Sequence, residues 1–450
     1  MRNLKRAFWG FLILLSLLWL LAEPSALQPA GLFPFRATMI QFTGVLAIGC
    51  MSLAMLLALR LRWPERWLGG LDKMYRFHKW LGIAALVIGA THWLWVKVPP
   101  WAVSMGWIER AGRGGRPPPG GPVEAFIAGW RSEAVSSGEW AFYGLIILMA
   151  LALIPAVSYR IFAKTHRVIA IAFLALAFHA AVLIRFRHWT MPVGWVTALL
   201  LAGGVAAAVI ALLGFVAAGR RVKGSIAALT YYPGIRAIET TIAIPEGWPG
   251  HKAGQFAFKI TDAAEGGHPY TIASAWRPED KRVTFIIKEL GDYTRRLSER
   301  LRVGMPVRVE GPYGSFTFDD DCPEQIWIGG GIGITPFIAR LEHMVLQKDA
   351  PDWPPGQQAH LFHTTADVDE QALGNLVADA AAADVRLHIL VDSRRGRLTG
   401  ERIRAEVPGW SEASIWFCGP AAFGAALRRD FAAHGFPVES RFHQELFSMR

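Results

Sequence analysis

Long apolar runs separated by short basic segments fill the first half of the chain. The runs span residues 7–22, 38–59, 77–96, 140–157, 166–184 and 193–218. A helix rises about 1.5 Å per residue, so each run crosses most of a hydrocarbon core about 30 Å thick. The pattern predicts a membrane domain of six helical spans over residues 1–219. A signal peptide is the alternative for the first run, but the segment after it is broken by proline and offers no small-residue cleavage site.

From residue 220 onward the apolar positions follow a different period. Short strand-like runs, among them 224–232, 254–261 and 282–290, are separated by turn residues. They predict a small antiparallel β-barrel over residues 220–320. From residue 321 to 450 strands alternate with helical segments, which is typical of a doubly wound α/β nucleotide-binding domain. The sequence therefore predicts a membrane bundle followed by a soluble module of two domains.

The net charge of +11 indicates membrane orientation rather than nucleic-acid binding. With a cytoplasmic N-terminus, the inner segments that flank the spans hold 15 lysines and arginines and the outer ones hold eight. Because cytoplasmic segments carry the basic excess, we expect the soluble module on the cytoplasmic side of a bacterial-type inner membrane. The three cysteines are widely separated, which excludes a disulfide framework, a cysteine zinc site and a cysteine-ligated iron–sulfur cluster.

Four histidines lie within the third and fifth apolar runs. His78 and His92 are 14 residues apart, and His166 and His179 are 13 apart, so each interval covers about 20 Å of helix. Imidazole is a natural axial ligand for heme iron, and ionisable residues inside a membrane are functional candidates by default. The spacing predicts two stacked hemes b, with His78 and His166 on the inner iron and His92 and His179 on the outer iron. A lone histidine would more often be a hydrogen-bonded core residue.

The two spacings differ in the rotation that they imply. On an ideal helix, 14 residues return a side chain to within about 40° of the same face, whereas 13 residues rotate it by about 220°. The fifth span must therefore present His166 and His179 from different sides, or depart from ideal winding.

A glycine-rich turn between a strand and a helix marks the nucleotide-binding half. In IWIGGGIGITPF (326–337), the glycines let the backbone approach a pyrophosphate, and the helix N-terminus offers free N–H groups and a positive dipole. The spacing is not G-x-G-x-x-G, so a turn that merely requires glycine is the alternative.

Two further segments suit a flavin. HPYTIAS (268–274) combines a proline-fixed turn with a tyrosine that can lie along an isoalloxazine and hydroxyls that can bond the ring or ribitol. IKELGDYT (287–294) places a lysine and a threonine beside a glycine turn, which suits a diphosphate. In isolation, each would also be expected of an ordinary turn and an exposed strand.

The order and spacing of these segments along the chain are more specific than any one of them. A barrel, HPYTIAS, IKELGDYT, GPYG (311–314), the glycine-rich turn, FCGP (417–420) and an aromatic near the C-terminus together resemble the ferredoxin–NADP reductase superfamily. With six spans and four histidines in front, the chain resembles the ferric reductase/NADPH oxidase family. The resemblance covers essentially the whole chain apart from a Gly/Pro-rich outer loop.

The resemblance implies roles for particular residues. FAD would be bound by His268, Pro269, Tyr270, Thr271, Ser274, Lys288, Gly291 and Thr294. The nicotinamide nucleotide would be bound by Gly311, Pro312, Gly314, Gly330, Gly331, Gly333, Thr335, Pro336, Gly419 and Pro420. Cys418 would act on the nicotinamide side, and Phe447 would shield the flavin until nicotinamide displaces it, with Phe442 as the alternative.

The choice between NADPH and NADH stays open. Relatives that prefer NADPH place an arginine after the strand that corresponds to LFHTT, where this chain has Thr364, Thr365 and Ala366. Arg394 and Arg395 could substitute for that arginine or be surface charge. The chain lacks a calcium loop of the D-x-[DN]-x-[DN]-G pattern, so calcium gating is not expected.

The resemblance implies an electron path from cytoplasmic NAD(P)H through FAD and two hemes to an acceptor on the outer face. Oxygen, giving superoxide, is the expected acceptor, with a ferric chelate as the alternative and a quinone or partner as a third. Arg36 loosely matches the family's outer-face arginine and is a candidate acceptor-site residue. For Arg185, Arg187 and His188 on the same face, pairing with heme propionates or lipid headgroups is favoured.

No nucleic acid and no obligatory protein partner are expected, beyond the lipid bilayer and a small-molecule acceptor. A rival of another class is a heme-free membrane anchor, or a proton-conducting histidine bundle, fused to a soluble flavin reductase.

Overall fold

Two compact units make up the chain, one ending at Ala217 and the other beginning at Ala218. The computed structural model describes residues 2–28, 31–109, 120–154, 156–261, 267–291, 293–348, 357–392 and 396–445.

The first unit is helical. Its long helices are α1 (Arg2–Ala22), α2 (Leu32–Ala58), α4 (Leu71–Ser104), α6 (Arg131–Leu153), α7 (Tyr159–Leu183) and α8 (Pro192–Leu212), with the short α3 (Arg62–Leu68) and α5 (Pro122–Gly129) between them. Six helices among the described residues are long and apolar enough to cross a membrane. The chain is thus a multi-pass membrane protein, as the hydropathy pattern predicts.

The ends of several helices differ from the predicted spans. Helix α4 extends to Ser104 and α6 begins at Arg131, whereas the predicted spans ended at residue 96 and began at residue 140. Hydropathy locates only the apolar window, and these helices continue beyond it through polar and aromatic residues. Helix α8 ends earlier than predicted, because Gly214 turns the chain with a φ of +79°.

The C-terminal part of α4 contains two consecutive prolines. Pro99 and Pro100 have no N–H, so the carbonyls of Trp95 and Val96 lose their helical donors. Arg36 on α2 donates from Nε to the Trp95 carbonyl (2.9 Å) and from Nη2 to the Val96 carbonyl (3.0 Å). One guanidinium therefore replaces both missing hydrogen bonds.

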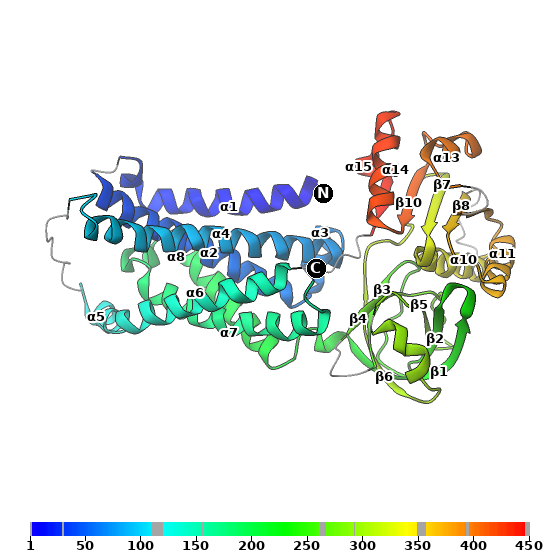
Figure 1. Ribbon diagram of the computed structural model, residues 1–450, viewed down its shortest axis with the longest axis horizontal. Helices are drawn as coiled ribbons and strands as arrows, with labels where there is room; N and C mark the ends of the chain where they lie inside the picture. Colours follow the sequence, from blue (N-terminus) through cyan, green and yellow to red (C-terminus); the bar gives the residue numbers. More distant parts are fainter. Residues whose placement is uncertain are drawn as a thin grey trace. The chain divides into compact units, whose positions relative to one another are not determined.

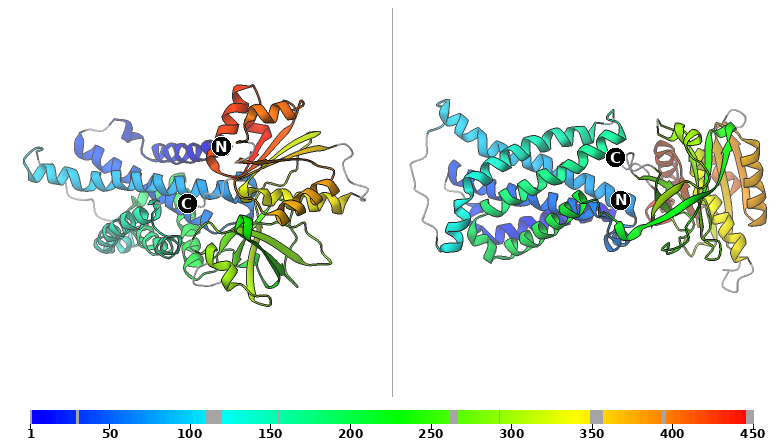
Figure 2. Two further views of the ribbon diagram at one scale, coloured as in Figure 1. Left: turned by 45° about the vertical axis from the view of Figure 1, so that its right-hand side comes forward. Right: turned by 90° about the horizontal axis from the view of Figure 1, so that it is seen from below.

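Helix pairs organise the bundle. Helix α2 packs along α4 and α8, and α6 packs along α7. Figures 1 and 2 show the long helices of the bundle side by side. Gly204 on α8 allows the close contact with α7 and α2, because a Cβ there would lie 2.7 Å from the Phe173 ring. The histidine-bearing helices α4 and α7 thus each have a partner helix beside them.

The second unit begins with an antiparallel sheet in the order β4-β3-β6-β1-β2-β5. A bridge from Ile272 to Phe285 joins its two edges and closes the barrel. The strands are β1 (Arg221–Tyr232), β2 (Ala237–Ala243), β3 (Phe256–Ile260), β4 (His268–Thr271), β5 (Arg282–Lys288) and β6 (Pro306–Tyr313), with the short α9 (Leu297–Arg300) before β6. Alternate residues such as Ile238, Ile242 and Val309 fill its interior.

A parallel sheet in the order β11-β10-β7-β8-β9 follows. Its strands are β7 (Glu324–Gly330), β8 (Gln358–Thr365), β9 (Arg386–Val391), β10 (Ser414–Cys418) and β11 (Phe442–Gln444). Its helices are α10 (Thr335–Gln347), α11 (Glu370–Ala382), α13 (Gly400–Glu406), α14 (Ala421–Ala433) and α15 (Val438–Arg441). Apolar clusters pack α10 and α11 on one face and α13 and α14 on the other, which is the predicted doubly wound arrangement (Figure 1).

Candidate functional site

The four membrane histidines form two facing pairs. The ring centres of His78 and His166 are 5.8 Å apart with planes crossing at 65°, and those of His92 and His179 are 6.2 Å apart with planes at 79°. Each pair joins α4 to α7, in the combinations predicted from depth. The 14 residues between His78 and His92 separate the pairs by about 20 Å along α4.

Backbone carbonyls set the protonation of three of these rings. Nδ1 of His78 donates to the Ala54 carbonyl (2.9 Å), Nδ1 of His92 to the Ile40 carbonyl (3.0 Å), and Nδ1 of His179 to the Ala134 carbonyl (2.8 Å). Because a carbonyl can only accept, each Nδ1 carries the proton and each Nε2 keeps a lone pair. A carbonyl on Nδ1 is also the usual outer partner of a metal-bound histidine.

The two helices present their histidines differently. On α2, the acceptors Ala54 and Ile40 are 14 residues apart, as are His78 and His92 on the antiparallel α4, so one contact geometry repeats. Helix α7 is continuous through both of its histidines. His179 turns to α6, whereas the Nδ1 of His166 is buried without a hydrogen-bond partner among the described residues and its ring stacks on Phe162. Both histidines of α7 thus face a histidine of α4, but their Nδ1 atoms have different surroundings.

Glycines make room for the outer pair. A Cβ on Gly138 of α6 would lie 2.0 Å from Nδ1 of His179, and one on Gly44 of α2 would lie 3.3 Å from Cε1 of His92. A distance of 2.0 Å is incompatible with any side chain. Gly138 is therefore required for His179 to occupy this position.

These pairs fit a heme iron better than a bare metal ion. Across the described residues, no three His, Cys, Asp or Glu side chains gather at one point. With metal–nitrogen bonds of about 2 Å, ring centres 5.8 and 6.2 Å apart leave room for one iron between the imidazoles of each pair. His78 and His166 would hold one heme, and His92 and His179 would hold the other.

Three of the predicted outer-face residues contact one carboxylate, that of Glu23. Arg185 and Arg187 both form ion pairs with Glu23, which follows α1, and Nε2 of the buried His188 lies 3.4 Å from the same carboxylate. Burial alone would raise the pKa of Glu23, but hydrogen bonds from Arg187 and Ser25 and the arginine charges lower it to about 2. The cluster fastens α1 to the α7–α8 connection. With Arg36 bonded to two carbonyls, its acceptor role stays a prediction.

The first flavin segment lies on β4 at the edge of the barrel. The His268 ring stacks on Tyr293 at 4.2 Å with planes at 13°, which brings HPYTIAS beside IKELGDYT. Thr294 Oγ1 accepts from the N–H groups of Leu290 and Gly291 and holds the glycine turn. Ser274 Oγ accepts from the Thr284 N–H (3.0 Å), so this hydroxyl orders the barrel.

Lys288 points to the nucleotide-binding domain. Its Nζ lies 2.6 Å from Oδ2 of Asp367, in the loop after β8, and its role at an FAD phosphate stays a prediction. Beside this ion pair is a cavity of about 390 Å³, lined by Ser274 and Lys288 from the barrel and by Ile332 and Thr365 from the parallel-sheet domain. The cavity connects the flavin segment with the glycine-rich turn.

The glycines of that turn have two separate uses. A Cβ on Gly333 would lie 2.2 Å from the Cys418 carbonyl, and one on Gly330 would lie 3.0 Å from Pro420, so both allow close packing against the CGP turn. Gly331 has a φ of +58° and open space where a Cβ would be. Next to the N-terminus of α10, that open position suits a phosphate.

Glu445 is a site residue that sequence reasoning missed. It is buried, and a Cβ on Gly314 would lie 2.6 Å from its Oε1. Burial, together with the charge of Glu445, raises the pKa of the Cys418 thiol. Glu445 thus lies near the GPYG turn of the barrel and near the end of β10. An acid between the aromatics of the tail FHQELF was the available signal.

The structure does not describe all of the predicted site residues. Phe447, Arg394 and Arg395 lie outside the described residues. Phe442, the alternative to Phe447, is buried in the core beneath β10 and begins β11.

Family comparisons agree with this geometry. Residues 43–177 match the ferric reductase like transmembrane component, a segment that includes His78, His92 and His166. Residues 223–317 match an FAD-binding domain. The chain has the architecture of the ferric reductase/NADPH oxidase family. It is a multi-pass membrane component joined to an FAD-binding domain, as in a membrane flavin-dependent oxidoreductase.

Curated relatives match parts of the chain. An NADPH oxidoreductase of Mycobacterium tuberculosis is 31% identical over 173 residues, which cover 38% of this chain and 44% of that protein. A flavohemoprotein of Bordetella pertussis is 30% identical over 166 residues (34% and 39%). Ferric reduction oxidase 5 of Arabidopsis thaliana is 34% identical over 85 residues (18% and 12%). The chain spans less than half the length of these relatives.

Solved structures resemble about half of the chain. A cytochrome P450 reductase of Amycolatopsis has a TM-score of 0.43 and 22% identity, and covers 51% of this chain and 70% of its own. The FAD/NAD-binding domain of a nitric oxide dioxygenase from Vibrio cholerae has a TM-score of 0.42 and 16% identity, with 50% and 98% covered.

Proposed function

We propose that this protein transfers electrons from cytoplasmic NAD(P)H, through FAD and two b-type hemes, to an acceptor at the outer face of an inner membrane. Two pairs of facing imidazoles carry the proposal. The pairs lie at two depths along the helices, and in each pair the rings leave room for an iron between them. The FAD-binding domain in the same chain supplies the electron donor.

The cofactors supply the redox chemistry: bound FAD accepts a hydride, and bound hemes carry its electrons singly across the membrane. The chain binds and orients these groups. Nδ1 bonds to Ala54, Ile40 and Ala134 direct the Nε2 atoms of three histidines to metal binding. The open position at Gly331 and the segment at Thr294 would hold diphosphates, and Glu445 and Cys418 would border the nicotinamide.

We propose oxygen as the acceptor, with a ferric chelate as the alternative. Ferric chelates are commonly anionic, and their recognition requires available cationic groups. Arg185 and Arg187 share the Glu23 carboxylate, and Arg36 is bonded to two carbonyls. The engagement of these three arginines favours a small neutral acceptor.

We also propose NADH as the preferred donor. Thr364 Oγ1 donates to Oδ1 of Asp392 (3.0 Å) where β8 and β9 end, along the strand edge that carries the glycine-rich turn. A carboxylate in that position accepts a hydrogen bond from the 2′-hydroxyl of an adenosine ribose and repels a 2′-phosphate. The name of the M. tuberculosis relative, an NADPH oxidoreductase, gives the opposite expectation.

The test is the product yield of purified full-length protein, loaded with FAD and heme and supplied with NADH. With oxygen as acceptor we expect superoxide in nearly two equivalents per NADH, and slower formation of iron(II) when a ferric chelate is added anaerobically. Faster iron(II) formation with little superoxide would make the ferric-reductase alternative correct. No transfer to either, with normal flavin reduction, would favour a quinone or partner protein.

The rival class, a heme-free anchor or proton-conducting bundle with an attached flavin reductase, makes a different prediction. Membranes that contain such a protein would oxidise NADH but show no b-type absorption. The carbonyl-bonded Nδ1 atoms argue against proton conduction, because they fix one tautomer on three of the four rings.

A further inference from the structure

The tail strand β11 is short, and few backbone hydrogen bonds hold it in the sheet. Among the described strands it pairs only with β10, through Ile415 with Phe442, Trp416 with His443 and Phe417 with Gln444. A strand of three residues at a sheet edge makes few ladder hydrogen bonds, so side chains must fix its register. The buried Phe442 supplies one such contact.

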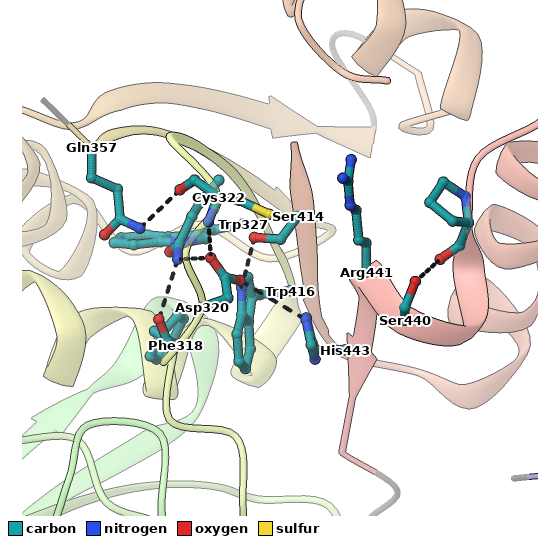
Figure 3. A network of polar contacts seen from close by, with 12 residues as sticks. Phe318, Asp320, Cys322, Trp327, Gln357, Ser414, Trp416, Ser440, Arg441 and His443 are labelled. Carbon is teal, nitrogen blue, oxygen red and sulfur yellow. Dashed lines mark hydrogen bonds and ion pairs between the residues drawn. The ribbon is translucent and has the colours of Figure 1, made fainter. Parts of the chain in front are cut away.

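A polar network supplies the second contact. We call it the Asp320 network, and it consists of Asp320, Gln325, Trp416 and His443. Figure 3 shows Asp320 beside Trp416 and His443. The His443 ring stacks on Trp416 with centres 4.0 Å apart and planes at 17°. Trp416 Nε1 donates to Oδ2 of Asp320 (3.0 Å), and Nε2 of His443 lies 3.9 Å from the same oxygen. The carboxylate therefore contacts both members of the stack.

Both oxygens of Asp320 are used. Oδ1 accepts from the Cys322 N–H (3.1 Å) and from Nε2 of the fully buried Gln325 (3.0 Å), whose Oε1 accepts from Trp327. Asp320 lies in the connection from barrel strand β6 to β7. The network thus joins that connection, the sheet strand β10 and the tail.

The tail delivers Glu445 two residues after His443. Glu445 lies close to Gly314 of the barrel turn, and its charge acts on Cys418 at the end of β10. A slip of one residue in β11 would turn Glu445 to the opposite side of the strand. Its place therefore depends on the register that the His443–Trp416 stack holds.

We propose that Asp320 and Trp416, acting through His443, are positioning residues that set Glu445 at the place where nicotinamide meets flavin. The proposal rests on the proposed function. Because hydride transfer requires close approach, a shift of about 1 Å can slow it up to a hundredfold without weakening binding equally. The network therefore acts on the rate of flavin reduction more than on nucleotide affinity.

The experiment measures anaerobic flavin reduction by NADH in stopped flow, with full-length, FAD-loaded protein. We expect His443→Ala to lower the limiting rate constant about 10-fold to 100-fold, with FAD content retained and the dissociation constant for NADH changed much less. His443→Phe keeps a ring on Trp416 and should recover part of the rate. Asp320→Asn, which is isosteric, should slow reduction in the same direction. His434→Ala, at the exposed histidine that follows α14, is the matched control.

Several outcomes would overturn the proposal. One is a wild-type rate of flavin reduction in His443→Ala. Another is a loss of rate that is fully explained by lost FAD. A third is a His443→Phe rate no higher than that of His443→Ala. If His443→Ala fails to fold, an unchanged rate in Asp320→Asn overturns it equally. A wild-type protein that binds FAD but is not reduced by either nucleotide would instead refute the proposed function.

Discussion

The membrane unit and the reductase unit place their functional groups in different ways. In the membrane unit, the imidazoles lie on long helices and are oriented by backbone carbonyls of neighbouring helices, such as Ala54 and Ala134. In the reductase unit, functional groups lie at strand ends and depend on side chains distant in sequence, such as Asp320 and His443. Backbone carbonyls survive any substitution, whereas side-chain networks do not. Function of the membrane unit should therefore be most sensitive to substitutions that add volume beside an imidazole. Function of the reductase unit should be most sensitive to substitutions that remove a side-chain contact.

The largest expected effect comes from removing the outer imidazole pair. His92→Leu with His179→Leu should reduce electron transfer to the outer acceptor more than a hundredfold, because a leucine side chain has no atom that can bind iron. Flavin reduction by NADH should be unchanged. Acceptor reduction and flavin bleaching, measured on the same preparation, check this. Equal loss of both would mean that the two units do not function separately.

The next effect concerns space beside His179. Gly138→Ala should displace that ring, since a Cβ would lie 2.0 Å from its Nδ1, and should lower the outer heme content severely. Gly144→Ala on the same helix is the matched control, because nothing lies within 4 Å of a Cβ there. Heme per chain in the two variants is the measurement. Similar heme contents in the two variants would contradict the proposed binding of the outer heme by His179.

The third effect lies in the barrel interior, at Lys259. The residue is 2% exposed, its Nζ donates to Thr240 Oγ1 (2.9 Å), and burial lowers the pKa of Lys259 to about 7. Between pH 7 and 10 the unfolded chain binds more protons at this position than the native one, so stability should rise with pH, by about 1.4 kcal/mol per unit.

Lys259→Met should remove that slope, being more stable than wild type near pH 6 by a few kcal/mol and similar near pH 10. Reductase unfolding followed by flavin fluorescence at several pH values measures the slope. Lys252→Met, at an exposed lysine, should keep the wild-type slope. A Lys259→Met protein with the wild-type slope would show that the amine is solvated.

The smallest expected effect concerns nucleotide choice. Wild-type protein should prefer NADH, and Asp392→Asn should shift the ratio of kcat/KM for NADH and NADPH toward NADPH by about tenfold, or 1.4 kcal/mol, by removing a charge. Thr364→Ser, which keeps the hydroxyl on Asp392, is the control. A wild-type preference for NADPH would instead assign the 2′-phosphate to the arginines at 394 and 395.

The sequence predicted the membrane half well, because period and hydropathy are local properties. Six spans and the pairing of histidines by depth followed from spacing alone, but the carbonyl partners and the role of Gly138 required neighbouring helices. In the reductase half, the order of strands and glycine turns was readable. The Lys288–Asp367 pair, the burial of Glu445 and the bonding of Arg36 were not, since each joins segments that only the folded chain brings together.

Heme stoichiometry decides whether the two histidine pairs hold hemes. Pyridine hemochrome analysis of purified full-length protein, with a reduced-minus-oxidised spectrum, should show two b-type hemes per chain. We expect about one in the His92→Leu, His179→Leu protein and none when His78 and His166 are also replaced by leucine. Absence of b-type absorption in wild type, or unchanged heme content in these variants, would contradict the account.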